Sequence, residues 1–166
     1  LEVCLFRGSV ETRLRKLEEG QADATLLACA GLNRLDKASV ITHPLEKADM
    51  LPAVAQGAIG IEHRAADTDV GELLNAINHD ESRLRVTCER AMLAELDGSC
   101  RTPIAGHAVL REDGRIYLEA SLLSPDGTQR FDVSGDSDPS KAKELGARLG
   151  RALRDQAGKD FPAYQI

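Results

Sequence analysis

Residues 106–133 read GHAVLREDGRIYLEASLLSPDGTQRFDV, and this stretch decides the fold. Apolar residues occupy every second position from Ile116 to Leu122 and alternate with mostly polar neighbours, as in a strand that buries one face. Asp113-Gly114 and Pro125-Asp126-Gly127 are turn sequences on either side of this strand. We therefore predict a three-stranded antiparallel sheet with strands at residues 106–111, 115–123 and 129–133.

Two helices are predicted to flank this sheet. The first has Asp80 as its N-cap, ends at Gly98, and carries an apolar stripe of four residues at a spacing of four: Leu84, Cys88, Met92 and Leu96. The second has Asp138 as its N-cap and Pro139 at its first position. Its stripe consists of Leu145, Leu149 and Leu153. We expect this second helix to cover the buried face of the sheet.

The first 77 residues show a different sequence pattern, in which short apolar runs alternate with segments of helical periodicity. We predict strands at residues 3–6, 24–28 and 58–62, and helices or helical turns at residues 12–18, 31–35 and 52–55. A strand followed by a helix, twice over, is typical of a parallel or mixed sheet. The fold class is therefore α/β followed by α+β, with one domain at residues 1–77 and a second at residues 78–166.

Composition excludes several classes of function. The 166 residues carry a formal net charge of −6, which leaves no basic surplus for binding nucleic acid, and no apolar run is long enough to cross a membrane. The four cysteines and four histidines lack the spacing of a metal site or a disulfide framework, so we expect no metal and reduced thiols. The chain opens on a strand-like run without a leader pattern, and we expect it to be the C-terminal part of a longer protein.

One cysteine stands apart from the other three. Cys88 lies on an apolar stripe, and Cys4 and Cys29 lie in apolar segments, so we interpret all three as small buried residues. Cys100 lies in LDGSCRTPIAG (residues 96–106), a polar loop after a helix end. A helix C-terminus raises the pKa of a nearby thiol, whereas Arg101 lowers it. The residues alone leave open whether Cys100 is functional; as a nucleophile it would need a reactive electrophile or cations from elsewhere.

Arginines form a second candidate site. Arg7 precedes a glycine, and Arg13 lies in the first turn of the next helix, where the helix dipole disfavours a basic side chain. This placement is typical of a site that binds a carboxylate or a phosphate. Gly31 and Arg34 repeat the pattern of a glycine and a basic residue after a strand. A solvated helix face explains Arg7 and Arg13 equally well, and the pattern does not choose between the two interpretations.

Four stretches, taken in order, resemble the porphobilinogen deaminase (hydroxymethylbilane synthase) family. They are FRGSVETRL (6–14), LPAVAQGAIGIEHR (51–64, the crossing segment), ERAMLAELDGSCRTPIAG (89–106) and SPDGT (124–128). The resemblance implies that Cys100 carries a dipyrromethane cofactor through a thioether. It implies that four porphobilinogen units condense head to tail on this primer with release of ammonia, before hydrolysis frees hydroxymethylbilane. An azafulvene formed by loss of ammonia is electrophilic enough for a thiol of ordinary pKa.

The resemblance also assigns roles in the cleft. It implies that guanidinium groups bind the acetate and propionate groups of the pyrroles, and that a few further residues lie near the cleft. The guanidinium groups are those of Arg7, Arg13 and Arg34, and the nearby residues are Ala28, Gly31 and Gln56. The sequence departs from the family pattern at Ser9, where Asn is common, and at Ala55 and Ser99, where Gly is common.

For the rest of the protein, the resemblance implies a periplasmic-binding-protein-like mixed-sheet domain before the small C-terminal domain. Residues 1–77 would hold the second half of the central domain and the strand that returns to the N-terminal domain. The catalytic aspartate belongs to the N-terminal part of the family, so we expect no turnover by this chain alone. The partners would be porphobilinogen, the growing pyrrole chain and that N-terminal part. The whole enzyme would be a cytoplasmic monomer that binds neither nucleic acid nor membrane. The alternative is a stand-alone anion-binding α/β module in which Cys100 is incidental.

Overall fold

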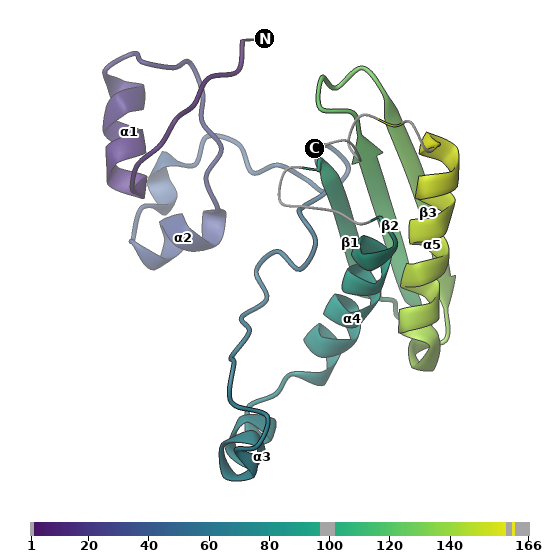
Figure 1. Cartoon of the computed structure of the whole chain (residues 1–166). Helices are drawn as coiled ribbons and strands as arrows, with labels where there is room; N and C mark the ends of the chain where they lie inside the picture. The colour runs from purple at the N-terminus through teal and green to yellow at the C-terminus, as the bar shows by residue number, and fades with distance from the viewer. Residues whose placement is uncertain (1, 97–101, 159–160, 162–166) are drawn as a thin grey trace. The chain divides into compact units, whose positions relative to one another are not determined.

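The computed structural model describes residues 2–96, 102–158 and 161. Contacts divide the chain into two compact units, residues 1–46 and 47–166, whose helices and strands are labelled in Figure 1. Residues 47–77 group with the second unit by contact, and the domain boundary near residue 78 stays a prediction. None of the described helices is both long and apolar enough to cross a membrane.

The first unit contains two short helices, α1 (Val10–Glu18) and α2 (Cys29–Arg34), and a 3₁₀ turn at Ala38–Val40. Helix α1 begins where Ser9 caps it, because the Ser9 hydroxyl accepts a hydrogen bond from the Thr12 amide at 3.2 Å. Both predicted helices are confirmed, and each begins two residues earlier than expected.

The sheet predicted for the first half of the chain is not confirmed. Residues 3–6, 24–28 and 58–62 have no strand ladder with any described residue. A strand exists only through a hydrogen-bonded neighbour, and the side chains of Val3 and Ile59 are 94% and 92% exposed. Cys4 and Cys29, predicted to be buried, are also exposed, since no sheet covers their segments. The periplasmic-binding-protein-like arrangement is therefore not established by this chain.

The crossing segment differs from its prediction as well. A helix was expected at residues 52–55, but Ala53 forms an antiparallel bridge with Ala105, and Pro52 accepts a hydrogen bond from the Gly106 amide at 3.0 Å. Pairing with a strand edge satisfies the same backbone groups that a helix would use. Ala55 follows with φ of 59°, the left-handed conformation that glycine adopts most easily.

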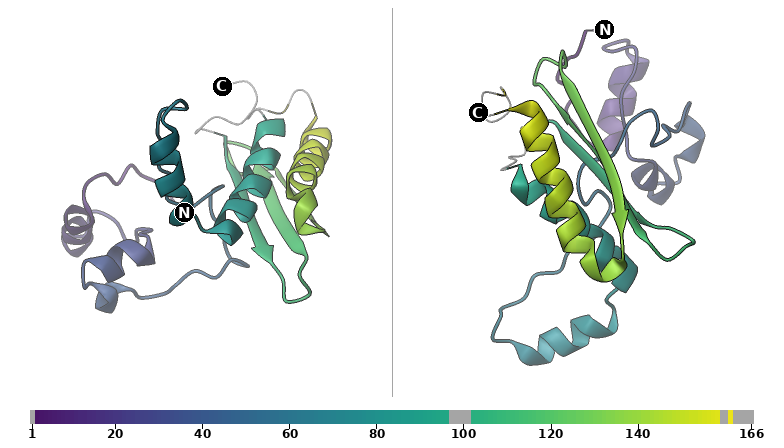
Figure 2. Two further views of the ribbon diagram at one scale, coloured as in Figure 1. Left: turned by 90° about the horizontal axis from the view of Figure 1, so that it is seen from below. Right: turned by 90° about the vertical axis from the view of Figure 1, so that its right-hand side faces the viewer.

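The described residues of the second unit form three α-helices, a 3₁₀ turn at Pro139–Lys141 and a three-stranded sheet. Its elements are α3 (Thr68–Ala76), α4 (Asp80–Glu95), β1 (Ile104–Leu110), β2 (Ile116–Leu123), β3 (Arg130–Ser137) and α5 (Ala142–Ala157). The strands pair antiparallel in the order β1-β2-β3, which confirms the predicted meander. Helix α4 is capped by His79, one residue before the predicted cap, and α3 was not predicted. Figures 1 and 2 show α4 and α5 side by side along the sheet.

One hydrophobic core lies between the sheet and these two helices. The alternating residues of β2 are buried as predicted, and so are the apolar stripes of α4 and α5, of which only Leu84 is partly exposed. Burial raises the pKa of Cys88 to about 12, so this residue remains a protonated thiol within the core. The interpretation of Cys88 as a small buried residue is confirmed.

Two glycines of α5 allow this helix to lie close to α4. A Cβ atom on Gly150 would lie 2.5 Å from the carbonyl oxygen of Met92, and one on Gly146 would overlap the carbonyl oxygen of Cys88. Both obstacles are backbone atoms of a helix and cannot move independently of it. Hydrogen atoms alone fit between the two helices at these positions.

We predict that Gly146→Ala lowers the free energy of unfolding by about 2 kcal/mol, as overpacking of a core does. The new methyl group must push α5 away from α4, and this cost exceeds the roughly 1 kcal/mol by which alanine favours a helix over glycine. Urea unfolding followed by circular dichroism measures the change. Gly60→Ala is the control, because a Cβ atom there meets nothing within 4 Å. Equal stability of the two variants would contradict the tight contact.

Candidate functional site

The turn that leads into α1 has a position that only glycine fits. Gly8 has φ of 137°, and a Cβ atom on it would lie 2.7 Å from the methyl carbon of Thr12. The Lys16 ammonium group donates a hydrogen bond to the Arg7 carbonyl oxygen at 3.1 Å, which fixes the residue before this turn. Arg7 and Arg13 therefore flank a rigid helix entry.

Among the described residues, Arg13 has a buried side-chain hydrogen-bond donor without a partner. Its Nη1 lies 3.5 Å from the Leu26 carbonyl oxygen, to which it donates. Its Nε is buried and has no hydrogen-bond partner among the described residues. A buried guanidinium donor without an acceptor is costly, and a carboxylate supplies the acceptor geometry that a guanidinium prefers. Arg13 thus has the features of an anion-binding residue.

The other predicted residues of the first unit lie around α2. Ala28 caps this helix, and its carbonyl oxygen accepts from the Gly31 amide at 3.0 Å, while Arg34 is the last helical residue. The structure connects Arg13 to this region through Leu26, two residues before Ala28. The side chains of Arg7 and Arg34 are exposed. Convergence of the three arginines on one ligand stays a prediction.

Cys100 lies outside the described residues, together with Ser99 and Arg101. The elements on either side of it are described: α4 ends at Glu95 with Leu96 as its C-cap, and β1 begins at Ile104. The predicted attachment site therefore lies, in sequence, between two elements whose inner faces form the core of the second unit.

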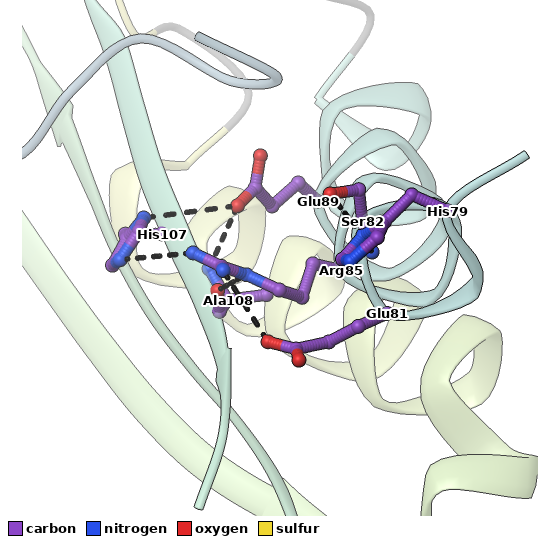
Figure 3. A network of polar contacts seen from close by, with 7 residues as sticks. All are labelled: His79, Glu81, Ser82, Arg85, Glu89, His107 and Ala108. Carbon is purple, nitrogen blue, oxygen red and sulfur yellow. Dashed lines mark hydrogen bonds and ion pairs between the residues drawn. The ribbon is translucent and has the colours of Figure 1, made fainter. Parts of the chain in front are cut away.

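A polar network that the sequence did not reveal joins α4 to β1 and to the crossing segment. The Glu89 side chain is buried, and each of its oxygens accepts a backbone hydrogen bond. Oε2 accepts from the Ala55 amide at 2.7 Å, and Oε1 accepts from the Ala108 amide at 2.8 Å. Figure 3 shows the Glu89 side chain reaching from α4 toward β1.

Arg85 and His107 belong to the same network, in which Arg85 also pairs with Glu81 at 3.5 Å (Figure 3). Arg85 Nε donates to the Ala108 carbonyl oxygen at 2.7 Å, and its Nη2 lies 3.5 Å from His107 Nε2. His107 Nδ1 is 4.0 Å from Glu89 Oε1. Burial, and to a lesser degree the positive charges of Lys47 and Arg85, lower the pKa of His107. The imidazole is therefore neutral at pH 7, and the Glu89 carboxylate has backbone amides as its hydrogen-bond donors.

Gln56 lies beside the same network. It lines a cavity of about 190 Å³ together with Arg85, Glu89 and His107. A second cavity, of about 730 Å³, lies between the crossing segment, α3 and α4. In the described part of the chain no group of three His, Cys, Asp or Glu residues could hold a metal ion. The polar lining of the smaller cavity offers hydrogen-bond donors for oxygen atoms of a ligand.

The lowered pKa of His107 predicts a specific pH dependence of stability. At pH values above the ordinary value of 6.5 neither state protonates this residue; below it the unfolded chain takes up the proton first, so stability falls with falling pH. Urea midpoints at pH 7, 6 and 5 should therefore fall more steeply for the unchanged chain than for His107→Gln. His43→Gln is the control, and parallel curves for His107→Gln and the unchanged chain would contradict the assignment.

Comparison with known proteins places these observations in a family. Residues 1–72 match the family model described as "Porphobilinogen deaminase, dipyromethane cofactor binding domain", and residues 83–155 match "Porphobilinogen deaminase, C-terminal domain". The two models together contain both candidate regions, the arginines of the first unit and the Glu89 network of the second.

Curated relatives agree with these matches. The chain is 48% identical to "Porphobilinogen deaminase" of Nitrobacter hamburgensis over 161 residues, which are 97% of this chain and 51% of that protein. It is 49% identical to "Porphobilinogen deaminase, chloroplastic" of Pisum sativum over 94% of this chain and 43% of that protein. It is 48% identical to the protein of the same name from Oryza sativa over 97% of this chain and 46% of that protein. The chain spans about half the length of these relatives, and it belongs to the porphobilinogen deaminase family.

Proposed function

We propose that this chain forms the cofactor-carrying part of a hydroxymethylbilane synthase in tetrapyrrole biosynthesis. The enzyme would join four porphobilinogen units head to tail, release ammonia at each step, and free hydroxymethylbilane by hydrolysis. The observation that carries this proposal is the match of two models of one enzyme family, in order, over residues 1–72 and 83–155.

Cys100 would hold the dipyrromethane cofactor. When bound, this group supplies the primer to which pyrrole units are added. For its attachment, the Cys100 sulfur forms a bond to the methylene carbon of a pyrrole that has lost ammonia, and the thiol proton passes to the pyrrole nitrogen. This electrophile is reactive enough for a thiol that is not activated. Attachment at Cys100, which lies between α4 and β1 in sequence, would put the primer on the second unit.

Arg13 would bind a carboxylate of the cofactor or of the growing pyrrole chain. Its buried Nε has no partner among the described residues, which fits a ligand rich in acetate and propionate groups. Arg7 and Arg34 would bind further carboxylates, since both side chains are exposed in the same unit. Ala28, Gly31 and Gln56 would lie near the cleft.

The remaining half of the enzyme would complete the site. We infer that an N-terminal part supplies the catalytic aspartate and the partner strands for residues 3–6, 24–28 and 58–62. These segments would then join a periplasmic-binding-protein-like mixed sheet. The chain alone would bind anions weakly and would not turn over porphobilinogen. The whole enzyme would act as a monomer in the cytoplasm, whereas the pea and rice relatives are named chloroplastic.

The attachment of the cofactor can be tested by intact mass. The chain is co-expressed with the half of the Nitrobacter hamburgensis relative that it does not cover, which we call the complemented enzyme. We expect an added mass of two linked pyrrole units, mapped by peptide digestion to Cys100 and absent from Cys100→Ala. Cys29→Ala, which removes an exposed thiol of the first unit, should keep the adduct. Unmodified protein that nevertheless forms product would contradict the proposal, and anion binding indifferent to Cys100→Ala, without product, would favour the anion-binding module.

The role of Arg13 can be tested in the same complemented enzyme. Arg13→Lys keeps the charge but removes Nε, and loss of a hydrogen bond between charged groups should lower kcat/KM about 10-fold or more. Arg15→Lys is the matched control on the same helix, because Arg15 is exposed and pairs only locally with Glu19. Steady-state formation of hydroxymethylbilane measures both variants. Equal losses in the two variants would show that Arg13 has no special role.

A further inference from the structure

The Glu89 carboxylate has no role in the proposed reaction, yet its position is costly. The residue is 5% exposed, and a carboxylate removed from water loses solvation that an apolar side chain would not lose. Helix α4 could bury an apolar residue at this position without that penalty. The carboxylate is therefore present for what it binds, and it binds the amides of two segments that lie far apart in sequence.

One of these amides belongs to the most strained residue of the crossing segment. Ala55 has φ of 59°, a conformation in which its Cβ atom crowds the backbone. The residues before it are fixed by the bridge of Ala53 to β1 and by Val54, which packs against the core. The Ala55 amide then points at Glu89 Oε2, 2.7 Å away. Strain of this kind persists only where surrounding contacts hold it.

The turn that follows Ala55 carries Gln56. The Gln56 amide donates to the Ala53 carbonyl oxygen at 3.0 Å, and the Ala58 amide donates to the Ala55 carbonyl oxygen at 3.1 Å. Gly57 has φ of 81° within this turn. These hydrogen bonds lie within the turn, and among the described residues it is the hydrogen bond from the Ala55 amide to Glu89 that joins the turn to α4.

No cation in the network competes with the amides for this carboxylate. Arg85 directs its Nε to the Ala108 carbonyl oxygen instead. His107 lies 4.0 Å from Glu89 Oε1 and is held neutral by burial. Glu89 Oε1 accepts from the Ala108 amide, so one carboxylate bridges the crossing segment and β1. Two directed hydrogen bonds fix a geometry more narrowly than an ion pair would.

We propose that Glu89 is a positioning residue, whose carboxylate clamps the turn of Ala55, Gln56 and Gly57 onto α4 and β1. The clamp fixes Gln56 relative to the domain that carries Cys100. Gln56 lines the cavity that Arg85 and His107 also line, so the clamp holds this residue at the wall of that cavity. The clamp is a property of this chain, and only its consequence for product formation rests on the proposed function.

Amide hydrogen exchange in this chain tests the clamp directly. Glu89→Gln keeps the size of the side chain but replaces one acceptor oxygen with an NH₂ group, so one of the two amides loses its bond. We expect the Ala55 or the Ala108 amide to exchange about 10-fold faster or more, equivalent to about 1.4 kcal/mol. Glu95→Gln is the matched control, because Glu95 lies on the same helix and pairs with Arg151 and Arg154 of α5.

The outcomes of this exchange experiment are decisive. Exchange at both amides that is unchanged in Glu89→Gln, or accelerated equally in Glu95→Gln, would overturn the clamp. If Glu89→Gln does not fold, Glu89→Asp gives the same comparison, because it keeps the charge and shortens the reach of the carboxylate. Faster exchange at Ala55 or Ala108 in that variant supports the clamp, and unchanged exchange at both contradicts it.

Ala55→Gly separates positioning from general stability. Glycine adopts a φ of 59° without strain, so the conformation of the turn should depend less on its hydrogen bond to the Glu89 carboxylate. In a double-mutant cycle of urea midpoints, Glu89→Gln should therefore shift the midpoint less in the Ala55→Gly background than in the unchanged chain. Additive shifts would show that Glu89 does not act through the conformation of Ala55, and would overturn the proposal.

The complemented enzyme tests the consequence for the reaction. Glu89→Gln should lower kcat for hydroxymethylbilane formation about 10-fold, Ala55→Gly should restore part of this loss, and Glu95→Gln should leave the rate unchanged. Full activity of Glu89→Gln would overturn the positioning role. If the unchanged complemented enzyme forms no product, the proposed function fails instead, and the exchange of the Ala55 and Ala108 amides still decides the clamp.

Discussion

The close contact of α4 with α5 sets the dimensions of the second unit. Because Gly146 and Gly150 present no side chain to α4, the backbones of the two helices approach each other near Cys88 and Met92. Both helices can then cover a sheet of only three strands, α4 chiefly over β1 and α5 chiefly over β3 (Figure 2). Separating the helices would uncover the apolar residues of β2 between them, and each Å² of apolar surface exposed costs about 25 cal/mol.

The free edge of β1 is the second constraint, and its closure determines where the crossing segment lies. An edge strand presents unpaired amides and carbonyls that need partners. Gly106 donates to the Pro52 carbonyl oxygen at 3.0 Å, while Ala108 uses its amide with Glu89 and its carbonyl oxygen with Arg85. The first half of the edge is thus closed by the crossing segment and the second half by two side chains of α4. The same contacts that close this edge therefore also position the turn that contains Gln56.

Patterns with a strong period predicted the second unit well. The alternation along β2 and the stripes of α4 and α5 reflect burial on one face, which local sequence encodes directly. The strands expected at residues 3–6, 24–28 and 58–62 depend on neighbours that no described residue supplies. The helix expected at residues 52–55 gave way to pairing with β1, a contact with a segment about 50 residues away. Helix α3 was missed because glycine, aspartate and asparagine interrupt its apolar pattern.

The candidate site shows the same division between local and long-range information. The sequence suggested Arg13 and Cys100 as site residues because each is unusual in its local context: Arg13 is basic in the first turn of a helix, and Cys100 stands in a polar stretch of sequence. Glu89 follows Cys88 on helix α4, and its local sequence does not distinguish it from Glu95, whose side chain is 25% exposed. The Glu89 carboxylate accepts a hydrogen bond from the Ala55 amide, 34 residues earlier in the chain, and no local sequence pattern indicates such a long-range contact. A charged side chain that positions a backbone segment can be recognised only when the position of that segment is known. The role of Glu89 therefore followed from the structure of the crossing segment and not from the sequence.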